Sequence, residues 1–254
     1  MRPNTTKAQL QAGKTVIGTQ IQQIVSTEPA RIFAAAGYDF VWIDGEHGPF
    51  GHESIQALVR AIAEAGPTSI VRVGEFSYSL VARALDAGAQ GVILPRASDV
   101  ERLREALSWT RFPPEGVRGY GLGGAHVDYE KVSVADVIAH RNLNTLNIVQ
   151  FESEWAIDHA DELLKLPFVD VALIGPADLS ISLGVPGQFD NPRLVATVEK
   201  LIAACQRSGV APGIHLRAAA AARAWIGRGM RFVSVGSEHI FMLERASEVV
   251  ASLR

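Results

Sequence analysis

The sequence predicts an α/β protein, a single (β/α)₈ barrel domain that spans residues 1–254. Short apolar, β-branched runs alternate with amphipathic runs of helical length, which is the pattern of parallel β-α-β units. Eight such strand–helix pairs follow one another, and eight is the number that closes a barrel. No Gly-x-Gly-x-x-Gly follows the first apolar run, which argues against a dinucleotide-binding open sheet.

The first half of the chain contains four predicted strand–helix pairs. Apolar runs predict strands at residues 15–21, 40–43, 68–73 and 91–95, and helical periodicity predicts helices at 26–36, 54–65, 79–87 and 99–109. Ser26 or Thr27 is the expected cap of the first helix. Residues 112–125 (FPPEGVRGYGLGGA) then break the rhythm. A Pro- and Gly-rich stretch without a period predicts a long loop, and loops of that length are usually functional or disordered.

The alternation resumes after a short helix predicted at residues 132–142. The next strands are expected at 146–151, 169–174, 210–214 and 232–235, with helices at 154–164, 192–208, 217–227 and 240–253. Pro192 suits the first turn of its helix. The single cysteine, Cys205, lies in a helical pattern, which favours a buried apolar role over a reactive thiol.

The composition is that of an ordinary globular protein, with 48% hydrophobic residues and a formal net charge of -3. Lys and Arg are scattered, so we expect no nucleic-acid partner. No apolar run approaches ~18 residues, and the start of the chain has no apolar signal-peptide core. We therefore expect a cytoplasmic protein that is not associated with a membrane.

Two neighbouring predicted strands end in a carboxylate, Glu152 after the fifth strand and Asp178 after the sixth. The carboxyl ends of barrel strands form the face on which active sites are built. Two acids there can share one divalent ion, and oxygen ligands favour Mg²⁺, Mn²⁺ or Co²⁺. The alternative is structural: Asp178 caps a turn and Glu152 forms an ion pair.

Polar residues also end the second and third strands. Arg72 needs an anion because leaving a buried guanidinium unpaired is unfavourable. Its partner is either Asp44 or Glu46, or a substrate oxygen that becomes negative during a reaction. His47 is either a general base or a solvated loop histidine.

The remaining candidates are weaker. Asp86 ends a helix, where a negative charge opposes the helix dipole, so a functional or interface role is expected. Gln150 and His215 lie near the mouth, and His215 is a possible substrate contact. Gly236-Ser237 after the last strand could instead cradle a phosphate, as in phosphate-handling barrels.

Several stretches, in this order and spacing, resemble the HpcH/HpaI aldolase family. The resemblance runs from about Gly18 to Val235 and rests on WIDGEH at 42–47, RV at 72–73, LDAGAQG at 85–91, RFPP with GVRG at 111–119, QFE at 150–152 and IGPADLSISLG at 174–184. It implies a metal-dependent class II pyruvate aldolase on a phosphoenolpyruvate/pyruvate-type barrel. Such enzymes reversibly cleave 4-hydroxy-2-oxo acids, such as 4-hydroxy-2-oxoheptanedioate, to pyruvate and an aldehyde.

The resemblance also implies roles for the residues of the mouth. Glu152 and Asp178 would hold the ion that pyruvate chelates, and Gln150 would line the metal site. The backbone from Gly175 through Pro176 to Ala177 would bind the pyruvate carboxylate. Arg72, held by Asp44, would stabilise the enolate oxygen, and His47, assisted by Asp86, would be the base. No lysine ends a predicted strand, so a Schiff-base route lacks its nucleophile.

The family also implies a homo-oligomer, a hexamer in which the last helix, about residues 238–254, is exchanged between subunits. Three positions depart from the family pattern: Gly18-Thr19-Gln20-Ile21, Gly48-Pro49-Phe50 after His47, and His215. We expect all three near the aldehyde half of the substrate, which leaves a sugar-acid aldolase of the 2-dehydro-3-deoxy-glucarate type open. A citrate lyase β-like acyl-CoA lyase and a non-catalytic binding barrel are the further alternatives.

Overall fold

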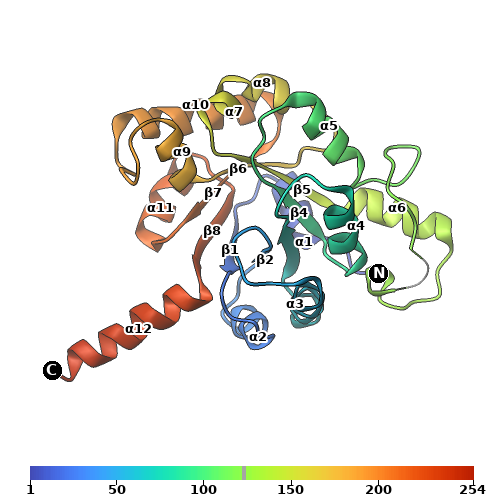
Figure 1. The fold of residues 1–254 in the computed structure, drawn as a ribbon, viewed down its shortest axis with the longest axis horizontal. Helices are drawn as coiled ribbons and strands as arrows, with labels where there is room; N and C mark the ends of the chain where they lie inside the picture. The colour runs from blue at the N-terminus through green and yellow to red at the C-terminus, as the bar shows by residue number, and fades with distance from the viewer. Residues whose placement is uncertain (122–123) are drawn as a thin grey trace.

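Eight parallel strands close into a barrel in the computed structural model, which describes residues 1–121 and 124–254 (Figure 1). Each strand pairs with the next along the chain, and the last pairs with the first. The strands are β1 (Val16–Ile21), β2 (Phe40–Asp44), β3 (Thr68–Arg72), β4 (Gly91–Leu94), β5 (Leu146–Phe151), β6 (Val171–Ile174), β7 (Ala211–Leu216) and β8 (Phe232–Ser237). The predicted (β/α)₈ barrel is confirmed.

Helices surround the barrel and connect its strands (Figure 1). They are α1 (Thr5–Gln11), α2 (Glu28–Ala35), α3 (His52–Ala65), α4 (Tyr78–Asp86), α5 (Val100–Ser108), α6 (Val134–Asn144), α7 (Glu154–Asp158), α8 (Ala160–Leu163), α9 (Pro176–Ser182), α10 (Pro192–Ser208), α11 (Ala219–Gly227) and α12 (Glu238–Ser252), with a 3₁₀ turn η1 (Ala125–Val127). Their apolar faces cover the outside of the barrel and form the larger core with the outward-facing strand residues. Cys205 is buried in that core, and burial raises the pKa of its thiol to about 12.

A second, smaller core fills the barrel interior. Phe40 and Phe232 stack there with ring centroids 4.0 Å apart. A Cβ on Gly18 would lie 2.3 Å from the Phe40 ring, so only glycine fits beside this stack. Apolar side chains therefore fill the floor of the barrel, below the polar groups at the carboxyl ends of the strands.

Several elements differ from the sequence prediction. The helix predicted at 154–164 is divided at His159, whose backbone is not helical (φ -97°, ψ 14°) and whose ring stacks on Trp155. Helices α1 and α9 were not expected; each has only seven residues, too few for a clear period. Of the loop predicted at 112–125, residues 112–121 contain no helix or strand, Ala125 begins η1, and residues 122 and 123 lie outside the described residues.

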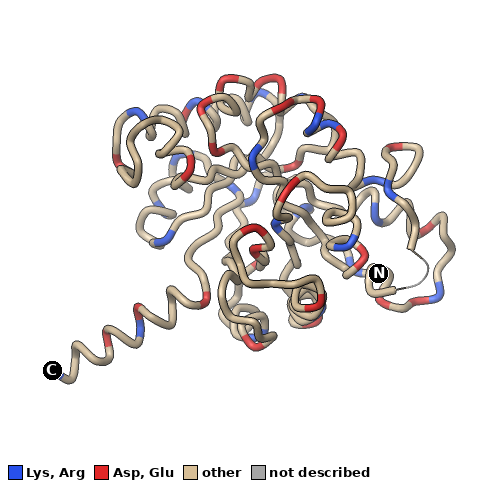
Figure 2. Tube along the Cα trace, in the orientation of Figure 1, with Lys and Arg blue, Asp and Glu red and all other residues tan. Residues whose placement is uncertain are grey.

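The last helix, α12, extends away from the barrel (Figure 1). Its first residue is anchored because the buried Glu238 carboxylate accepts hydrogen bonds from the backbone N–H groups of Gln22, Gln23 and Ile24. Farther along, the helix exposes large apolar side chains, namely Met242, Leu243, Val249 and Val250, with Leu253 at its end. Lys and Arg alternate with Asp and Glu around the rest of the molecule (Figure 2). Among the described residues, no helix is both long enough and apolar enough to cross a membrane.

Candidate active site

The centre of the barrel mouth is a buried ion pair between Asp44 and Arg72. The register pairs these two residues across β2 and β3, so both side chains leave the strands at the same height. Arg72 Nε lies 2.9 Å from Asp44 Oδ1, and Arg72 Nη2 lies 2.7 Å from Asp44 Oδ2. Such a two-pronged pair fixes the plane of the guanidinium. Its face also lies over Trp42, 5.2 Å from the ring centroid.

Glu46 is the second carboxylate in contact with Arg72. Its Oε2 lies 3.2 Å from Arg72 Nη1, and its Oε1 lies 2.6 Å from Nε of the exposed Arg96. Both acids expected as structural partners of Arg72, Asp44 and Glu46, therefore contact it, and the substrate oxygen as a further partner stays a prediction. One Arg72 edge is fully engaged by Asp44, which leaves Nη1 as the nitrogen that faces Glu46 and Gln150.

Glu152 and Asp178 line one cavity of about 230 Å³ at the carboxyl ends of β5 and β6. Burial raises the pKa of the Glu152 carboxyl, and the nearby Asp178 and Glu46 raise it further; the Arg96 backbone N–H, which donates to Glu152 Oε1 at 2.7 Å, acts in the opposite direction. Asp178 itself is exposed, so Glu152 is the desolvated member of the pair. A desolvated carboxylate beside a second acid favours either a proton or a cation.

Gln150 and Gly175 shape the wall beside Glu152. Gln150 Nε2 donates to Glu152 Oε2, while its Oε1 lies 3.4 Å from Arg72 Nη1. A Cβ on Gly175 would stand 2.9 Å from Gln150 Nε2 and 3.1 Å from Glu152 Oε2, so the β6 backbone can approach both groups only as glycine. The Gly175 N–H itself donates to Phe151 O at 3.3 Å. Pro176 opens α9 without an N–H, and the Ala177 N–H in the first turn has no intrahelical acceptor.

This cavity fits a divalent ion by the chemistry of its donors. Among residues 1–121 and 124–254, no group of three or more His, Cys, Asp or Glu side chains could hold a metal. A site built from Glu152 and Asp178 therefore has two protein ligands. It leaves the other positions of an octahedron to water and substrate, as is usual for Mg²⁺.

His47 lies on the adjoining cavity, of about 560 Å³, together with Glu46, Gly74 and Phe76. Its backbone N–H donates to Asp44 Oδ1 at 3.1 Å, which fixes the turn after β2. Its ring is half-exposed, with Nε2 3.8 Å from Glu46 Oε2. Arg96 lines both this cavity and the one at Glu152, so its side chain stands between the predicted base and the predicted metal ligands.

Asp86 is not brought to His47 within one chain. It ends α4, and its Oδ1 accepts a hydrogen bond of 2.7 Å from Nη2 of the buried Arg118. The Arg118 guanidinium explains why a carboxylate is tolerated at a helix end that disfavours negative charge. The predicted pairing of Asp86 with His47 thus has no contact to support it among the described residues of one chain.

His215 points into the top of the barrel interior, from β7. Its Nδ1 lies 2.8 Å from Ser234 Oγ on β8, and its ring meets the Trp42 ring edge-on at 5.3 Å. Burial and the Arg72 charge lower the pKa of its imidazole to about 4.

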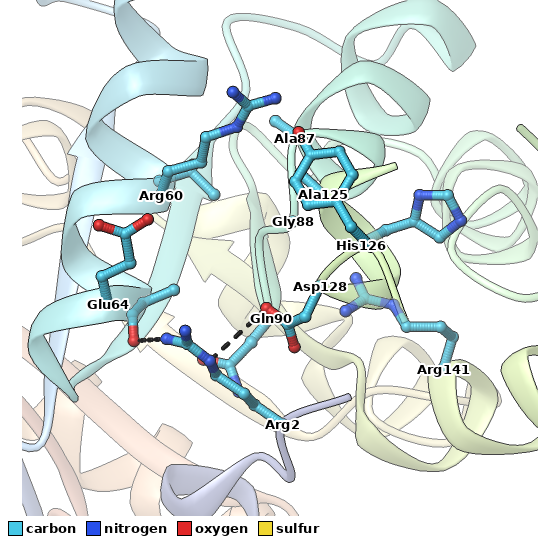
Figure 3. A pocket seen from close by; sticks show the side chains of 13 residues that line it. Arg2, Arg60, Glu64, Ala87, Gly88, Gln90, Ala125, His126, Asp128 and Arg141 are labelled. Atoms are coloured by element: carbon cyan, nitrogen blue, oxygen red, sulfur yellow. Dashed lines mark hydrogen bonds and ion pairs between the residues drawn. The ribbon is translucent and has the colours of Figure 1, made fainter. Parts of the chain in front are cut away.

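Gly236 and Ser237, the position suggested for a phosphate, are the last two residues of β8, and the buried Glu238 follows them directly. The Glu238 carboxylate accepts hydrogen bonds from the backbone N–H groups of residues 22–24, so these donors and this end of β8 already have a negatively charged partner. A different cavity, of about 200 Å³, lies where the strands begin and is lined by Arg2, Arg60, Gln90, His126 and Arg141 (Figure 3). Arg141 is explained structurally there, because its Nη2 donates to Ala89 O at 2.6 Å, in the segment between α4 and β4.

Two residues of the site, Gln20 and Arg96, were missed by sequence reasoning. Gln20 Nε2 donates to Asp44 Oδ2 at 2.8 Å, and Arg96 reaches both Glu46 and Glu152. Gln20 lies in one of the three stretches that depart from the family pattern, which was the available signal. Arg96, which follows Pro95, has a positive φ of 54°. Arginine rarely adopts this conformation, so the sequence gives no signal for it.

Paired carboxylates and a clamped guanidinium at a barrel mouth are groups with which enzymes stabilise negative charge on a substrate oxygen. Comparison with known proteins makes the class specific. A family model described as HpcH/HpaI aldolase/citrate lyase matches residues 25–244. The chain belongs to this family and is a carbon–carbon lyase.

Individual relatives cover almost the whole chain. A 4-hydroxy-2-oxo-heptane-1,7-dioate aldolase of Escherichia coli is 32% identical over 249 residues, 98% of this chain and 94% of that protein. A 2-keto-3-deoxy-L-rhamnonate aldolase of Salmonella gallinarum is 32% identical over 251 residues, 99% of this chain and 93% of that protein. The crystal structure of an HpcH/HpaI aldolase from Desulfitobacterium hafniense DCB-2 superposes with a TM-score of 0.93 at 31% identity, covering 97% of this chain and 95% of that one.

Proposed function

We propose that the chain is a divalent-metal-dependent, class II aldolase that reversibly cleaves 4-hydroxy-2-oxo acids to pyruvate and an aldehyde. The observation that carries the proposal is the shared cavity of Glu152 and Asp178 beside the fixed Arg72 guanidinium. The names of both aldolases above denote 2-oxo acid substrates, which agrees with this chemistry.

Glu152 and Asp178 would hold the ion, which we expect to be Mg²⁺, Mn²⁺ or Co²⁺. When bound, it supplies a Lewis acid for the 2-oxo group of the substrate. Gln150 Nε2 donates to Glu152 Oε2, and the Arg96 N–H donates to Glu152 Oε1, so the orientation of the carboxylate is fixed from both sides. The absence of a side chain at Gly175 lets Gln150 and Glu152 pack against the β6 backbone. The Ala177 N–H in the first turn of α9 would then bind the substrate carboxylate.

Arg72 would stabilise the oxygen that becomes negative when the carbon–carbon bond breaks. Because Asp44 engages Nε and Nη2, Nη1 remains available on the side of Gln150. A donor that is already fixed needs no reorganisation as charge develops, which makes its contribution large.

His47 would remove the proton from the C4 hydroxyl of the substrate. The C3–C4 bond then breaks, C4 leaves as the aldehyde, and the electron pair passes to the enolate of pyruvate. Protonation at C3 completes the reaction. The ring of His47 is half-exposed and is therefore accessible to a substrate bound in the barrel mouth. Help from Asp86 stays a prediction, because that residue pairs with Arg118.

The proposal is tested by measuring pyruvate release from a panel of 4-hydroxy-2-oxo acids with Mg²⁺, Mn²⁺ or Co²⁺, and after exhaustive chelation. We expect turnover only with metal, and a loss on the order of 10²-fold in the His47→Asn variant. His140→Asn on α6, far from the mouth, is the matched control. Equal turnover with and without metal would overturn the proposal.

We also propose that the protein is a homo-oligomer, a hexamer in which α12 is exchanged between copies. The helix leaves the barrel and exposes Met242, Leu243, Val249 and Val250. Exposed large apolar side chains gathered on one helix mark interaction sites. A second copy of the chain is the occupant that the family resemblance implies.

A further inference from the structure

His215 occupies the upper layer of the barrel interior, next to the predicted metal cavity. The register pairs Ile174 with Ile214, so Gly175 and His215 are neighbours across β6 and β7. Alternation along β7 directs Gly213 and His215 inward, and a Cβ on Gly213 would indeed meet Phe232 at the barrel floor. The His215 ring therefore borders the space between Gly175 and Trp42.

The hydrogen bonds around Ser234 determine which His215 nitrogen carries the proton. Trp42 Nε1 can only donate, and it lies 2.8 Å from Ser234 Oγ. The Ser234 hydroxyl then needs an acceptor for its own hydrogen, and His215 Nδ1, at 2.8 Å, is the acceptor that the described residues supply. Nδ1 thus accepts, and the neutral ring carries its hydrogen on Nε2.

The Nε2–H group donates to no acceptor among the described residues. Nε2 is nevertheless not fully buried, unlike the unpaired polar atoms elsewhere in the described residues. Because the ring points to the top of the barrel, Nε2 is accessible from the mouth. The charged groups that face the ring are Arg72 and Asp44, which already neutralise each other. Burial keeps the imidazole neutral, so the site presents one fixed, uncharged donor.

We propose that His215 is a specificity residue whose Nε2–H donates to a hydroxyl group on the aldehyde half of the substrate, so that the natural substrates are hydroxylated 2-oxo acids of the 3-deoxy sugar-acid class. The inference rests on the proposed aldolase function. An alkyl chain in the same place would leave the donor unpaired in a partly buried site, and such a loss is unfavourable by about 1–3 kcal/mol. A carboxylate would be better stabilised by a cation, but Arg72, the cation that faces the ring, gives Nε and Nη2 to Asp44 and is assigned through Nη1 to the oxygen that becomes negative.

Two aldehydes of nearly equal size, glycolaldehyde and propanal, test the proposal in condensation with pyruvate and Mn²⁺. We expect kcat/KM to favour glycolaldehyde by on the order of 10–100-fold in the natural chain. His215→Leu should bring the ratio to within about threefold of unity, and His215→Gln, which returns an N–H near Nε2, should restore part of it. His140→Leu is the matched control. An unchanged ratio in His215→Leu would overturn the proposal.

Two further measurements separate the possible failures. Exchange of the pyruvate methyl hydrogens in D₂O reports enolate formation without any aldehyde. If exchange is absent, the proposed aldolase function is wrong. If exchange persists in all variants while the ratio of kcat/KM for glycolaldehyde and propanal does not change, only the role of His215 is wrong.

The ¹⁵N spectrum of His215 in the natural chain requires no folded variant. A proton on Nδ1, or an ordinary titration near pH 6.5, would refute the assignment.

Discussion

Replacing Arg72 with alanine removes two hydrogen bonds to Asp44, of 2.9 and 2.7 Å, and an ion pair of 3.2 Å to Glu46. Removing one partner of a buried pair is unfavourable by about 3–5 kcal/mol. Asp44 keeps the Gln20 amide and the N–H groups of Glu46 and His47, so we expect the lower end of that range. At about 2–4 °C per kcal/mol for a domain of this size, Tm should fall by roughly 6–12 °C.

The same substitution should lower kcat for pyruvate release by about 10²–10³-fold, the usual effect of deleting one donor to a developing oxyanion. Arg72→Lys is the matched control: it keeps a charge but cannot reproduce the two-pronged contact, so an intermediate loss is expected. Thermal melts and steady-state kinetics on the same samples separate stability from catalysis. If Arg72→Ala retained more than about a tenth of the kcat, the assigned role in charge stabilisation would be wrong.

Three further predictions concern the surroundings of the pair. Gly175→Ala should lower activity at least about tenfold, because its Cβ displaces Gln150 and Glu152; Gly51→Ala, whose Cβ meets nothing within 4 Å, should be neutral in the same assay. The pKa of Glu152 is raised above its ordinary value of 4.5, so its ionisation opposes folding. The metal-free protein should therefore lose stability as the pH rises from 4.5 through the raised pKa of Glu152. In thermal melts, Glu152→Gln should flatten this fall of Tm with pH, and Mn²⁺ should reverse it. A steeper fall of Tm with pH in the variant would contradict the assignment to Glu152. Leu243→Glu on α12 should reduce the assembly size in sedimentation, whereas a full-size particle would speak against helix exchange.

Much of the fold could be predicted because strand and helix periods differ and the chain alternates between them eight times. Prediction was weakest for short elements. Helix α9 has seven residues and begins with Pro176, so in the sequence it resembles a turn that contains Asp178. Helix α1 depends on the cap in which Asn4 accepts from the Lys7 N–H, a local feature without a long apolar stripe.

For the site, the sequence indicates which polar residues reach the mouth but not how they pair. Asp44 and Arg72 end adjacent strands, and the register that joins them follows from that topology. The contact of Gln20 with Asp44 depends on side-chain direction across strands, which one sequence does not specify. Arg118 captures Asp86 through the long loop after α5, so the predicted partner of His47 lies elsewhere within the chain.

The most direct test of whether Glu152 and Asp178 bind one ion is a titration of the protein with Mn²⁺, followed by electron paramagnetic resonance. We expect one tightly bound Mn²⁺ per chain, and we expect both Glu152→Gln and Asp178→Asn to lose it. The control variant Asp161→Asn, which changes an exposed acid on α8, should retain it. Equal binding by either site variant and the natural chain would contradict this expectation.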